Sequence, residues 1–335
     1  MRLSSEIGLL SLATGVASLS AASGFVSVDE YFQRMPEEGE PVREMLKAGS
    51  TERTVSFKPF ETYWELLPKD SVLRDSEWKW LVKTGQGPVT NSSQSDGVED
   101  PYLVSTAYYF SWPKGNNISD ALGGAKGTMC TSTLESVDVP VSVLNKLPAD
   151  DHGNGDCAPV LGQECVDALL SKQGGAITVE GDSCRDLKQS WHDIPACRDS
   201  LGKDRKSATQ WAGTPLGGRN PANNATAPEW RSGHDFFLNI SHPVTGRDSD
   251  EYLKRVNQLH VLMFDARIPA ERKGQFVGGP QLLCTRVNAT KLPGGEDAML
   301  SESIRGNTSG AATGLACSMT LLMFGVTAAL ISMGV

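Results

Sequence analysis

The sequence lacks the short motifs by which many enzymes and metal sites are recognised. No Cys-x₂-Cys pair and no His-Glu-x-x-His run occurs, so the usual spacings of zinc ligands are missing. Gly-x-Ser-x-Gly is also missing, which removes support for the nucleophile turn of an α/β-hydrolase. The chain has no basic excess either, because 31 Lys and Arg face 40 Asp and Glu, for a net charge of −9. That balance argues against nucleic acid as a partner, since binding to phosphate groups requires a basic surface.

Charged residues are absent from the C-terminal run 315–335. The run is long enough to cross a membrane, but no Lys or Arg follows it to fix an orientation. Small residues and a short spacer precede it, which is the layout of a glycosylphosphatidylinositol (GPI) attachment signal. We therefore expect residues 308–335 to be removed and Asn307 to carry the lipid, with Gly306 and Ser309 as competing attachment residues. A retained membrane span is the alternative.

The N-terminus predicts delivery into the secretory pathway. Arg2 provides a positive charge, residues 7–19 are mostly apolar, and small residues follow at the −3 and −1 positions of a cleavage site after Ala22. This is the pattern of a secretory signal peptide, here residues 1–22. A buried N-terminal helix is the alternative. Together the two ends place the mature chain on the extracellular face of the plasma membrane or in the cell wall.

The cysteine count agrees with this processing. Seven cysteines would leave one unpaired in an oxidising compartment, but Cys317 lies in the segment that we expect to be removed. The remaining six allow three disulfides, and the sequence leaves their connectivity open. Five of them crowd between residues 130 and 197, which predicts a cross-linked middle region. The predicted disulfide residues are Cys130, Cys157, Cys165, Cys184, Cys197 and Cys284.

Acceptor sequences for N-glycosylation are more frequent than chance would place them. Six asparagines have Ser or Thr two positions later. One of these is Asn307, which we assign to the lipid and so exclude as a glycan carrier. The predicted glycosylation sites are Asn91, Asn117, Asn224, Asn239 and Asn288.

The N-terminal third of the mature chain predicts short helices. A capping-box spacing at Ser27 favours a helix that Pro36 ends. A second helix is expected at 42–48, and a third at 75–83 from the spacing of its apolar residues. Residues 85–100 are polar and rich in turn-forming types, so we interpret them as a linker.

After residue 100 the sequence changes to β-branched and aromatic residues with strict alternation in places. Strands outnumber helices in this part, and several connections are short. One long Gly-, Pro- and Asn-rich loop is expected at 200–234. The expected strands are 103–112, 137–143, 176–179, 259–268 and 281–288, and the expected helices are 165–172 and 250–258.

These elements predict an α+β fold with a mainly antiparallel sheet and short helices, stapled by disulfides. We divide the mature chain into an N-terminal helical segment with its linker (23–98), a disulfide-stapled α+β domain (99–290) and a short polar stalk (291–307). The chain shows no internal repeat and no long low-complexity tract.

Four short groups invite a chemical reading, and each has a plainer explanation. Gly-Asp-Ser, ending at Ser183, matches the core of GDSL-type hydrolases, but no Asp-x-x-His block follows to supply a base. His152 lies in an Asp- and Asn-rich run that offers oxygen ligands to calcium, although the EF-hand spacing is missing. His192 and His234 each precede an aspartate, yet adjacent side chains rarely face one another. We assign no catalytic residue, metal or cofactor, while paired carboxylates of a glycosidase stay open.

An aromatic cluster near the N-terminus allows two interpretations. It could form part of the core, or it could provide a platform on which sugar rings stack. The core is the more common outcome for such clusters. Its members are Phe57, Phe60, Tyr63, Trp64, Trp78 and Trp80.

The layout of signal peptide, N-glycosylated Cys-rich domain and GPI tail resembles the secreted, GPI-anchored proteins of filamentous fungi. The segment Leu-Leu-Cys-Thr-Arg, residues 282–286, is similar to the Leu-x-Cys-x-Arg ending of an uncharacterised group of ascomycete secreted proteins. This resemblance implies a surface location and no known activity.

We therefore expect a non-enzymatic GPI-anchored surface glycoprotein that acts in cell-wall organisation, adhesion or surface interaction. Its partners would be the outer leaflet of the plasma membrane, through the lipid, and a cell-wall glycan or surface protein. An extracellular hydrolase acting on wall polysaccharide is the alternative, and a small-ligand binder at the outer leaflet is a third reading.

Overall fold

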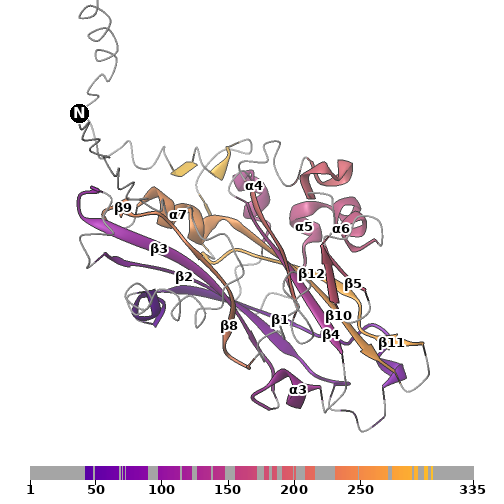
Figure 1. Cartoon of the computed structure of the whole chain (residues 1–335). Coiled ribbons are helices and arrows are strands. Elements are labelled where there is room, and N and C mark those ends of the chain that lie inside the picture. The colour runs from indigo at the N-terminus through magenta and orange to yellow at the C-terminus, as the bar shows by residue number, and fades with distance from the viewer. Residues whose placement is uncertain are drawn as a thin grey trace, which may run out of the picture.

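The computed structural model describes most residues between 42 and 304. Its main internal gaps are 90–96, 148–154, 172–176, 201–207, 216–230 and 293–297. The described residues form two antiparallel sheets packed face to face, with short helices on the outer surfaces (Figure 1). The expected α+β fold with mainly antiparallel sheets is confirmed.

The first sheet is five-stranded and entirely antiparallel, in the order β1-β2-β3-β8, with β9 also pairing with β3. Alternation explains its long strands, because Trp78, Trp80 and Val82 are buried while Lys79 between them is exposed. Its strands are β1 (Thr51–Phe57), β2 (Trp78–Pro88), β3 (Pro101–Ser111), β8 (Asp235–Ile240) and β9 (Val244–Thr245).

The second sheet is also five-stranded, in the order β11-β10-β4-β7, with β12 beside β10. The central strand β10 is buried along nearly its whole length, as its apolar run predicts. Its strands are β4 (Thr128–Ser136), β7 (Ala208–Pro215), β10 (Leu259–Pro269), β11 (Phe276–Val277) and β12 (Pro280–Thr285). A separate hairpin of β5 (Ile177–Glu180) and β6 (Ser183–Asp186) packs against this sheet.

Short helices cover the outer faces of both sheets. Helical residues 42–47 pack on the first sheet through Val42, Met45 and Leu46, which confirms the helix expected at 42–48. On the other side, α4, α5 and α6 lie over the second sheet (Figure 1). The helices are α3 (Ile118–Ala121), α4 (Val141–Leu144), α5 (Ala158–Leu161), α6 (Gln163–Leu170) and α7 (Asp250–Asn257), and the 3-10 turns are η1 (Trp64–Leu66), η3 (Trp191–Asp193) and η4 (Pro195–Cys197).

Two element predictions were wrong. Residues 75–83 were expected to be helical, but β2 begins at Trp78, because burying every second side chain outweighs a helical spacing of only three apolar residues. Residues 137–143 were expected to be a strand, but β4 ends at Ser136 and α4 follows Pro140. Proline has no amide hydrogen for a ladder and its backbone suits a helix start, so it ends the alternation here.

The predicted division at residue 98 falls within one sheet. β2 and β3 are hydrogen-bonded neighbours, from Lys79 opposite Ser111 to Pro88 opposite Tyr102. The polar segment 85–100 therefore includes the end of β2 and the connection of a hairpin, instead of a linker between units. Likewise β7 lies inside the loop expected at 200–234.

Aromatic side chains fill the space between the sheets. Trp78 is fully buried, and its ring centroid lies 5.0 to 6.3 Å from those of five other aromatic side chains. Phe110 stacks on Phe236 at 4.2 Å within the first sheet. Phe264 of β10 reaches across and contacts Phe57, Trp78 and Phe110 of that sheet, with centroids 5.5 to 5.8 Å apart. Large rings in edge-to-face contact thus join the two sheets.

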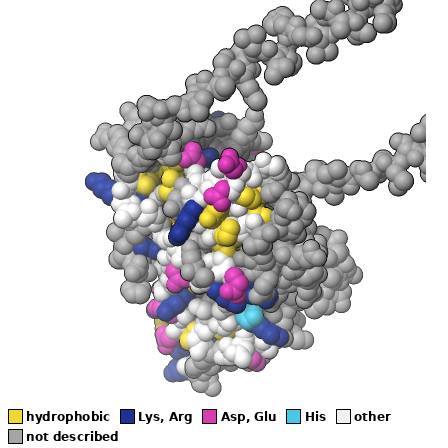
Figure 2. Space-filling model, turned by 90° about the vertical axis from the view of Figure 1, so that its left-hand side faces the viewer, with side chains coloured by type: hydrophobic (Ala, Val, Ile, Leu, Met, Phe, Trp, Pro, Cys, Tyr) yellow, Lys and Arg dark blue, Asp and Glu magenta, His cyan; other side chains and the backbone are white. Residues whose placement is uncertain are grey.

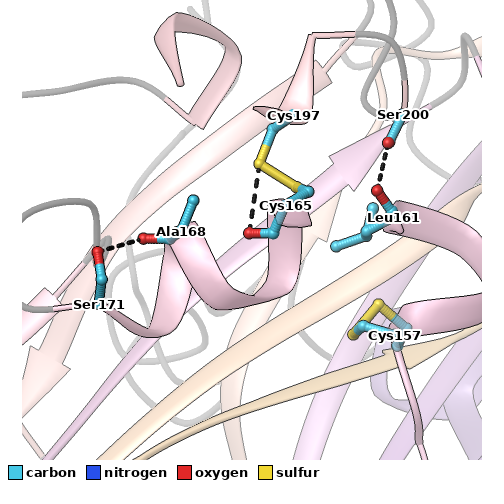
Figure 3. The surroundings of a disulfide bond; sticks show 8 residues. Cys157, Leu161, Cys165, Ala168, Ser171, Cys197 and Ser200 are labelled. Carbon is cyan, nitrogen blue, oxygen red and sulfur yellow. Dashed lines mark hydrogen bonds between the residues drawn. A yellow bond between two sulfur atoms is a disulfide. The ribbon is translucent and has the colours of Figure 1, made fainter. Parts of the chain in front are cut away.

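One disulfide fastens the helical layer to the second sheet, and another joins two elements within that layer. Cys157, at the start of α5, is bonded to Cys284 of β12, and Cys165 of α6 is bonded to Cys197 of η4 (Figure 3). Cys130 is also disulfide-bonded, to a residue whose side chain lies outside the described part. The predicted cross-linked middle region is confirmed at Cys130, Cys157, Cys165 and Cys197, and the predicted participation of Cys284 in a disulfide is confirmed as well. The side chain of Cys184 lies outside the described part, so its pairing stays a prediction.

The predicted signal peptide and lipid site lie outside the described residues. The segment predicted as a polar stalk, 291–307, is partly described and packs against the fold there, because Met299 pairs with Pro140 and both Leu300 and Ile304 are buried. Within the part of the chain that is described, no helix is long and apolar enough to cross a membrane.

Replacing Trp78 tests the role of the aromatic core. We expect Trp78→Ala to lower the free energy of unfolding by about 3–5 kcal/mol, because a large buried side chain is lost and a cavity forms. Trp64→Ala is the matched control, with an expected change within about 0.5 kcal/mol because that ring is largely exposed. Urea denaturation followed by circular dichroism measures both, and similar losses in the two variants would contradict the proposed core.

Candidate functional site

Two groups of side chains have functional potential, one buried and one exposed. The first, here called the buried polar cluster, consists of Tyr108, Glu135, Asn239, Arg255 and His260. Its members come from both sheets and from α7, which covers one end of the space between them. The second, described below, lies around η1 and β11.

The buried polar cluster is arranged around a neutral histidine. The hydroxyl of Tyr108 lies 2.7 Å from Nδ1 of His260, and Nε2 of His260 lies 3.2 Å from the carbonyl oxygen of Arg255. A carbonyl can only accept, so Nε2 carries the ring proton and Nδ1 accepts from the tyrosine hydroxyl. Tyr108, His260 and the backbone of α7 thus form one hydrogen-bonded chain from the first sheet through the second sheet to the helix.

Glu135 lies opposite His260 in the register of β4 and β10. The amide nitrogen of Asn239 donates to Oε2 at 2.7 Å, and the Tyr108 hydroxyl lies 3.4 Å from Oε1. The 3.8 Å separation of Oε1 from Nδ1 of His260 is not an ion pair, because that nitrogen carries no proton. Glu135 is therefore held mainly by Asn239 of the opposite sheet.

Burial governs the ionisation of this cluster. It lowers the pKa of His260 from 6.5 to about 3, against the raising effect of the hydrogen bond to the Arg255 carbonyl. Burial also raises the pKa of Glu135, with Arg255 acting in the opposite direction, and raises the pKa of Tyr108 well above 10. His260 and Tyr108 are therefore both uncharged at neutral pH.

The residue types of this cluster suit proton transfer, but their surroundings do not. Tyr108 and His260 are 0% exposed and Glu135 is 5% exposed, so no substrate reaches them in this conformation. A general acid or base must lie within hydrogen-bond reach of its substrate. We conclude that the cluster fixes the register of β3, β4 and β10, since a buried polar group is stable only where its partners are in place.

The second group, the exposed aromatic cluster, consists of Tyr63, Trp64 and Phe276. Their exposed fractions are 58, 46 and 48%, and they are the large hydrophobic side chains exposed in the described part of the chain. η1 and β11 lie side by side, and the amide of Gly278 donates to the carbonyl of Thr62 at 2.9 Å. A group of exposed apolar side chains in one region is typical of an interaction site, whereas single scattered ones are normal.

The aromatic pair sits on a rigid turn. The amides of Leu66 and Leu67 donate to the carbonyls of Tyr63 and Trp64 at 3.0 Å, and both leucines pack against the core. The guanidinium of Arg74 lies 4.5 Å from the centre of the Trp64 ring, in a cation–π contact that fixes the ring. The rings are thus held on the surface before any partner arrives.

Tyr63 adopts a left-handed backbone conformation, with φ 60° and ψ 28°. For a residue with a Cβ atom this conformation costs about 1 kcal/mol. Such strain concentrates at functional sites. Because most of the ring is exposed, burial offsets little of this cost.

The six aromatic residues that the sequence grouped together lie in two different environments. Phe57, Phe60, Trp78 and Trp80 belong to the core, which confirms the core reading for these four. Tyr63 and Trp64 are exposed, so the core reading was wrong for this pair. The sequence contained a signal for the difference: Trp78 and Trp80 alternate with charged residues, whereas Tyr63 and Trp64 are adjacent and lie between two glutamates.

The other sequence candidates are not brought together by the described residues. Asp156, from the run considered for calcium, accepts from the amide of Ala158 at 2.9 Å and so begins α5. His234 lies on an exposed turn before β8. Ser183, His152 and His192 lie outside the residues whose side chains are described. Among the described residues, no group of three His, Cys, Asp or Glu side chains is arranged to hold a metal.

Sequence reasoning missed His260 as the centre of the buried polar cluster. Its position two and four residues before Leu262 and Phe264 would have placed it on the inner face of a strand. Its partners could not be found in this way, because Tyr108 and Glu135 lie on other strands far away in the sequence.

Three of the five predicted glycosylation sites lie in the described part. Asn117 is half-exposed at the start of α3 and caps it with no side-chain hydrogen bond. The amide nitrogen of Asn239 points between the sheets to Glu135, and that of Asn288 donates to Asn257 at 2.8 Å. An N-glycan is attached to the side-chain amide nitrogen of asparagine. The contacts of this atom in Asn239 and Asn288 therefore favour Asn117 as the glycosylated residue among the three. Asn91 and Asn224 lie outside the described residues.

Comparisons with protein-family models, curated proteins and solved structures gave no match to this chain.

The neutral state of His260 predicts a pH dependence of stability. Its pKa is lower in the folded than in the unfolded chain, so its contribution is complete above pH 6.5 and is lost as the pH falls toward 3. The expected slope is about 1.4 kcal/mol per pH unit, and His260→Gln should lack it. Glu135 acts oppositely, since its raised folded pKa favours the folded state at low pH in both proteins. Urea unfolding between pH 7 and 4 measures the difference, and equal slopes would contradict a buried neutral His260.

The contact of Asn239 predicts which acceptor sequences are used. We expect Asn117 to carry a glycan and Asn239 to carry none, because attachment there would place a sugar between the sheets. Asn117→Gln should therefore increase electrophoretic mobility, whereas Asn239→Gln should leave it unchanged. Glycopeptide mass spectrometry checks both sites, and a fully occupied Asn239 in folded protein would refute the expected arrangement.

Proposed function

We propose that this protein is a non-enzymatic, GPI-anchored cell-surface glycoprotein that acts in adhesion, cell-wall organisation or another surface interaction. The sequence supports this through the signal peptide, the apolar C-terminal run and the acceptor sequences for glycans. The disulfides add support, because disulfides persist in oxidising compartments.

The observation that carries the proposal is the arrangement of two features at opposite ends of β4. Residues 298–300 pair with the chain just beyond its Ser136 end, where Met299 is opposite Pro140. The exposed aromatic cluster lies at its Thr128 end, where β10 continues into its pairing with β11. At about 3.3 Å per residue, the length of β4 from Thr128 to Ser136 is roughly 26 Å, and this length separates the two features. In Figure 1 the yellow C-terminal segments lie at the top and β11 at the lower right.

The placement of these two features at opposite ends of β4 suits a protein that is attached to the membrane at one end and contacts a partner at the other. A lipid at Asn307 would hold the protein only a few residues after Ile304, the last described residue. The exposed aromatic cluster would then face away from the membrane, toward the wall or a neighbouring cell. On the side of the molecule shown in Figure 2, charged side chains of both signs are interspersed with hydrophobic ones.

A non-enzymatic role is supported by the burial of Tyr108, Glu135 and His260, whose side-chain types are the ones here that suit acid–base catalysis. The buried polar cluster is closed to substrate, and the two glutamates beside the aromatic pair, Glu61 and Glu65, lie on a single exposed turn. Glycoside hydrolysis requires two carboxylates held on either side of the scissile bond. Turnover of a wall polysaccharide by the purified protein would refute this part of the proposal.

Anchoring is tested on intact cells. We expect phosphatidylinositol-specific phospholipase C to release the protein, after deacylation where the inositol is acylated, because the lipid would be its attachment to the membrane. Deletion of residues 315–335 should instead secrete it. Cells treated with heat-inactivated enzyme are the control. Retention of the deletion variant in the membrane, or tail peptides in the mature protein by mass spectrometry, would contradict the GPI model.

A further inference from the structure

We propose that the exposed aromatic cluster of Tyr63, Trp64 and Phe276 binds a neutral polysaccharide by stacking its rings on the C–H faces of the sugar units. The inference rests on the proposed function, since it names the chemistry that the exposed end of the protein recognises.

Ring geometry is the first argument. A pyranose ring has a flat face of C–H groups surrounded by hydroxyls, and this face packs against an aromatic ring. Tyr63 and Trp64 are consecutive residues with exposed side chains, and Phe276 adds a third exposed ring from β11, which contacts η1. Arg74 holds one face of Trp64, which leaves a fixed ring with 46% of its side chain exposed. A ring fixed in advance loses little conformational freedom on binding.

Backbone strain is the second argument. Tyr63 occupies a conformation that glycine adopts without cost, and its ring gains little from burial at 58% exposure. The fold therefore does not need a tyrosine at this position. Binding of a ligand would explain why an exposed tyrosine occupies this strained position next to a second exposed aromatic residue.

The polar surroundings indicate a ligand without net charge. Glu61, Thr62 and Glu65 are all exposed and flank the aromatic pair in the sequence, so carboxylate and hydroxyl groups are available beside the rings. Lys58 and Lys69 are exposed on either side and balance the two glutamates, so the remaining charge in this group is that of Arg74, whose guanidinium lies against the Trp64 ring. Sugar hydroxyls donate to carboxylates and accept from ammonium groups. An anionic polymer or lipid surface would instead require a basic excess.

Binding is measured with the full chain, purified in mild detergent where it carries lipid. The probes are soluble β-1,3-glucan, chitin oligosaccharides and mannan, and we expect saturable binding to at least one of them in titration calorimetry. Trp64→Ala should weaken binding by about tenfold, the loss of one ring contact of roughly 1.4 kcal/mol, and Trp64→Phe should retain most of it. Tyr102→Ala, a partly exposed aromatic on β3 far from β11, should bind like the parent protein.

Tyr63→Gly separates recognition from folding. This variant removes the ring and relieves the backbone strain, so it should bind more weakly while its melting temperature stays equal or rises. A fall in both would show that the tyrosine serves the fold and would overturn the second argument. Unchanged binding in Tyr63→Gly and Trp64→Ala together would overturn the proposal.

Binding tests with other ligands define the remaining results that would overturn the inference. Binding to none of the three polysaccharides would overturn the inference, as would binding only to anionic phosphatidylserine vesicles or to polylysine. These outcomes are distinct from failure of the proposed function. A protein that phospholipase C releases from cells, but that binds no neutral polysaccharide, keeps its surface role and loses this ligand.

Discussion

The contact of Phe264 with three rings of the opposite sheet is the interaction on which the rest of the structure depends. Phe57, Trp78 and Phe110 surround it, so β10 is joined to β1, β2 and β3 at one point. Separating the sheets would expose these large buried rings to water, which costs free energy in proportion to the apolar area exposed. At one end of this core lies the buried polar cluster, which depends on both sheets being in register. Beyond the other end lie η1 and β11, which the core holds through Leu66, Leu67 and Val277.

Much of the fold could be predicted from local patterns. β3, β5, β10 and α7 lie where the sequence placed them, because each is defined by its own periodicity and by flanking turn residues. The errors at 75–83 and 137–143 occurred where a few apolar residues fit two periods, and tertiary burial or a proline decided between them. The order of strands in a sheet depends on pairings between residues far apart in the sequence, such as Thr106 with Asn239. A local sequence pattern does not predict such pairings.

The candidate site was accessible to sequence reasoning only in part. The aromatic residues were identified together, yet their separation into core and surface depends on where β1 ends and η1 begins. Phe276 could not be associated with Tyr63 and Trp64 from sequence, since more than 200 residues separate them. Contacts formed in the fold bring the two segments together, among them the hydrogen bonds from Gly278 to Thr62 and from Gln281 to Lys58. The buried polar cluster was missed for the same reason, because five separate elements supply its side chains.

The placement of β4 has a mechanical consequence. The proposed anchoring at one end and binding at the other would pull the protein along the line between the two ends, which runs nearly along this strand. β4 is hydrogen-bonded on both sides, to β10 from Ser136 to Thr128 and to β7 from Ser136 to Cys130, with a register shift between Thr131 and Thr133. Antiparallel hydrogen bonds lie across the strands, so such a pull loads them together in shear instead of opening them one at a time. The strand between the two ends is therefore well suited to transmit tension.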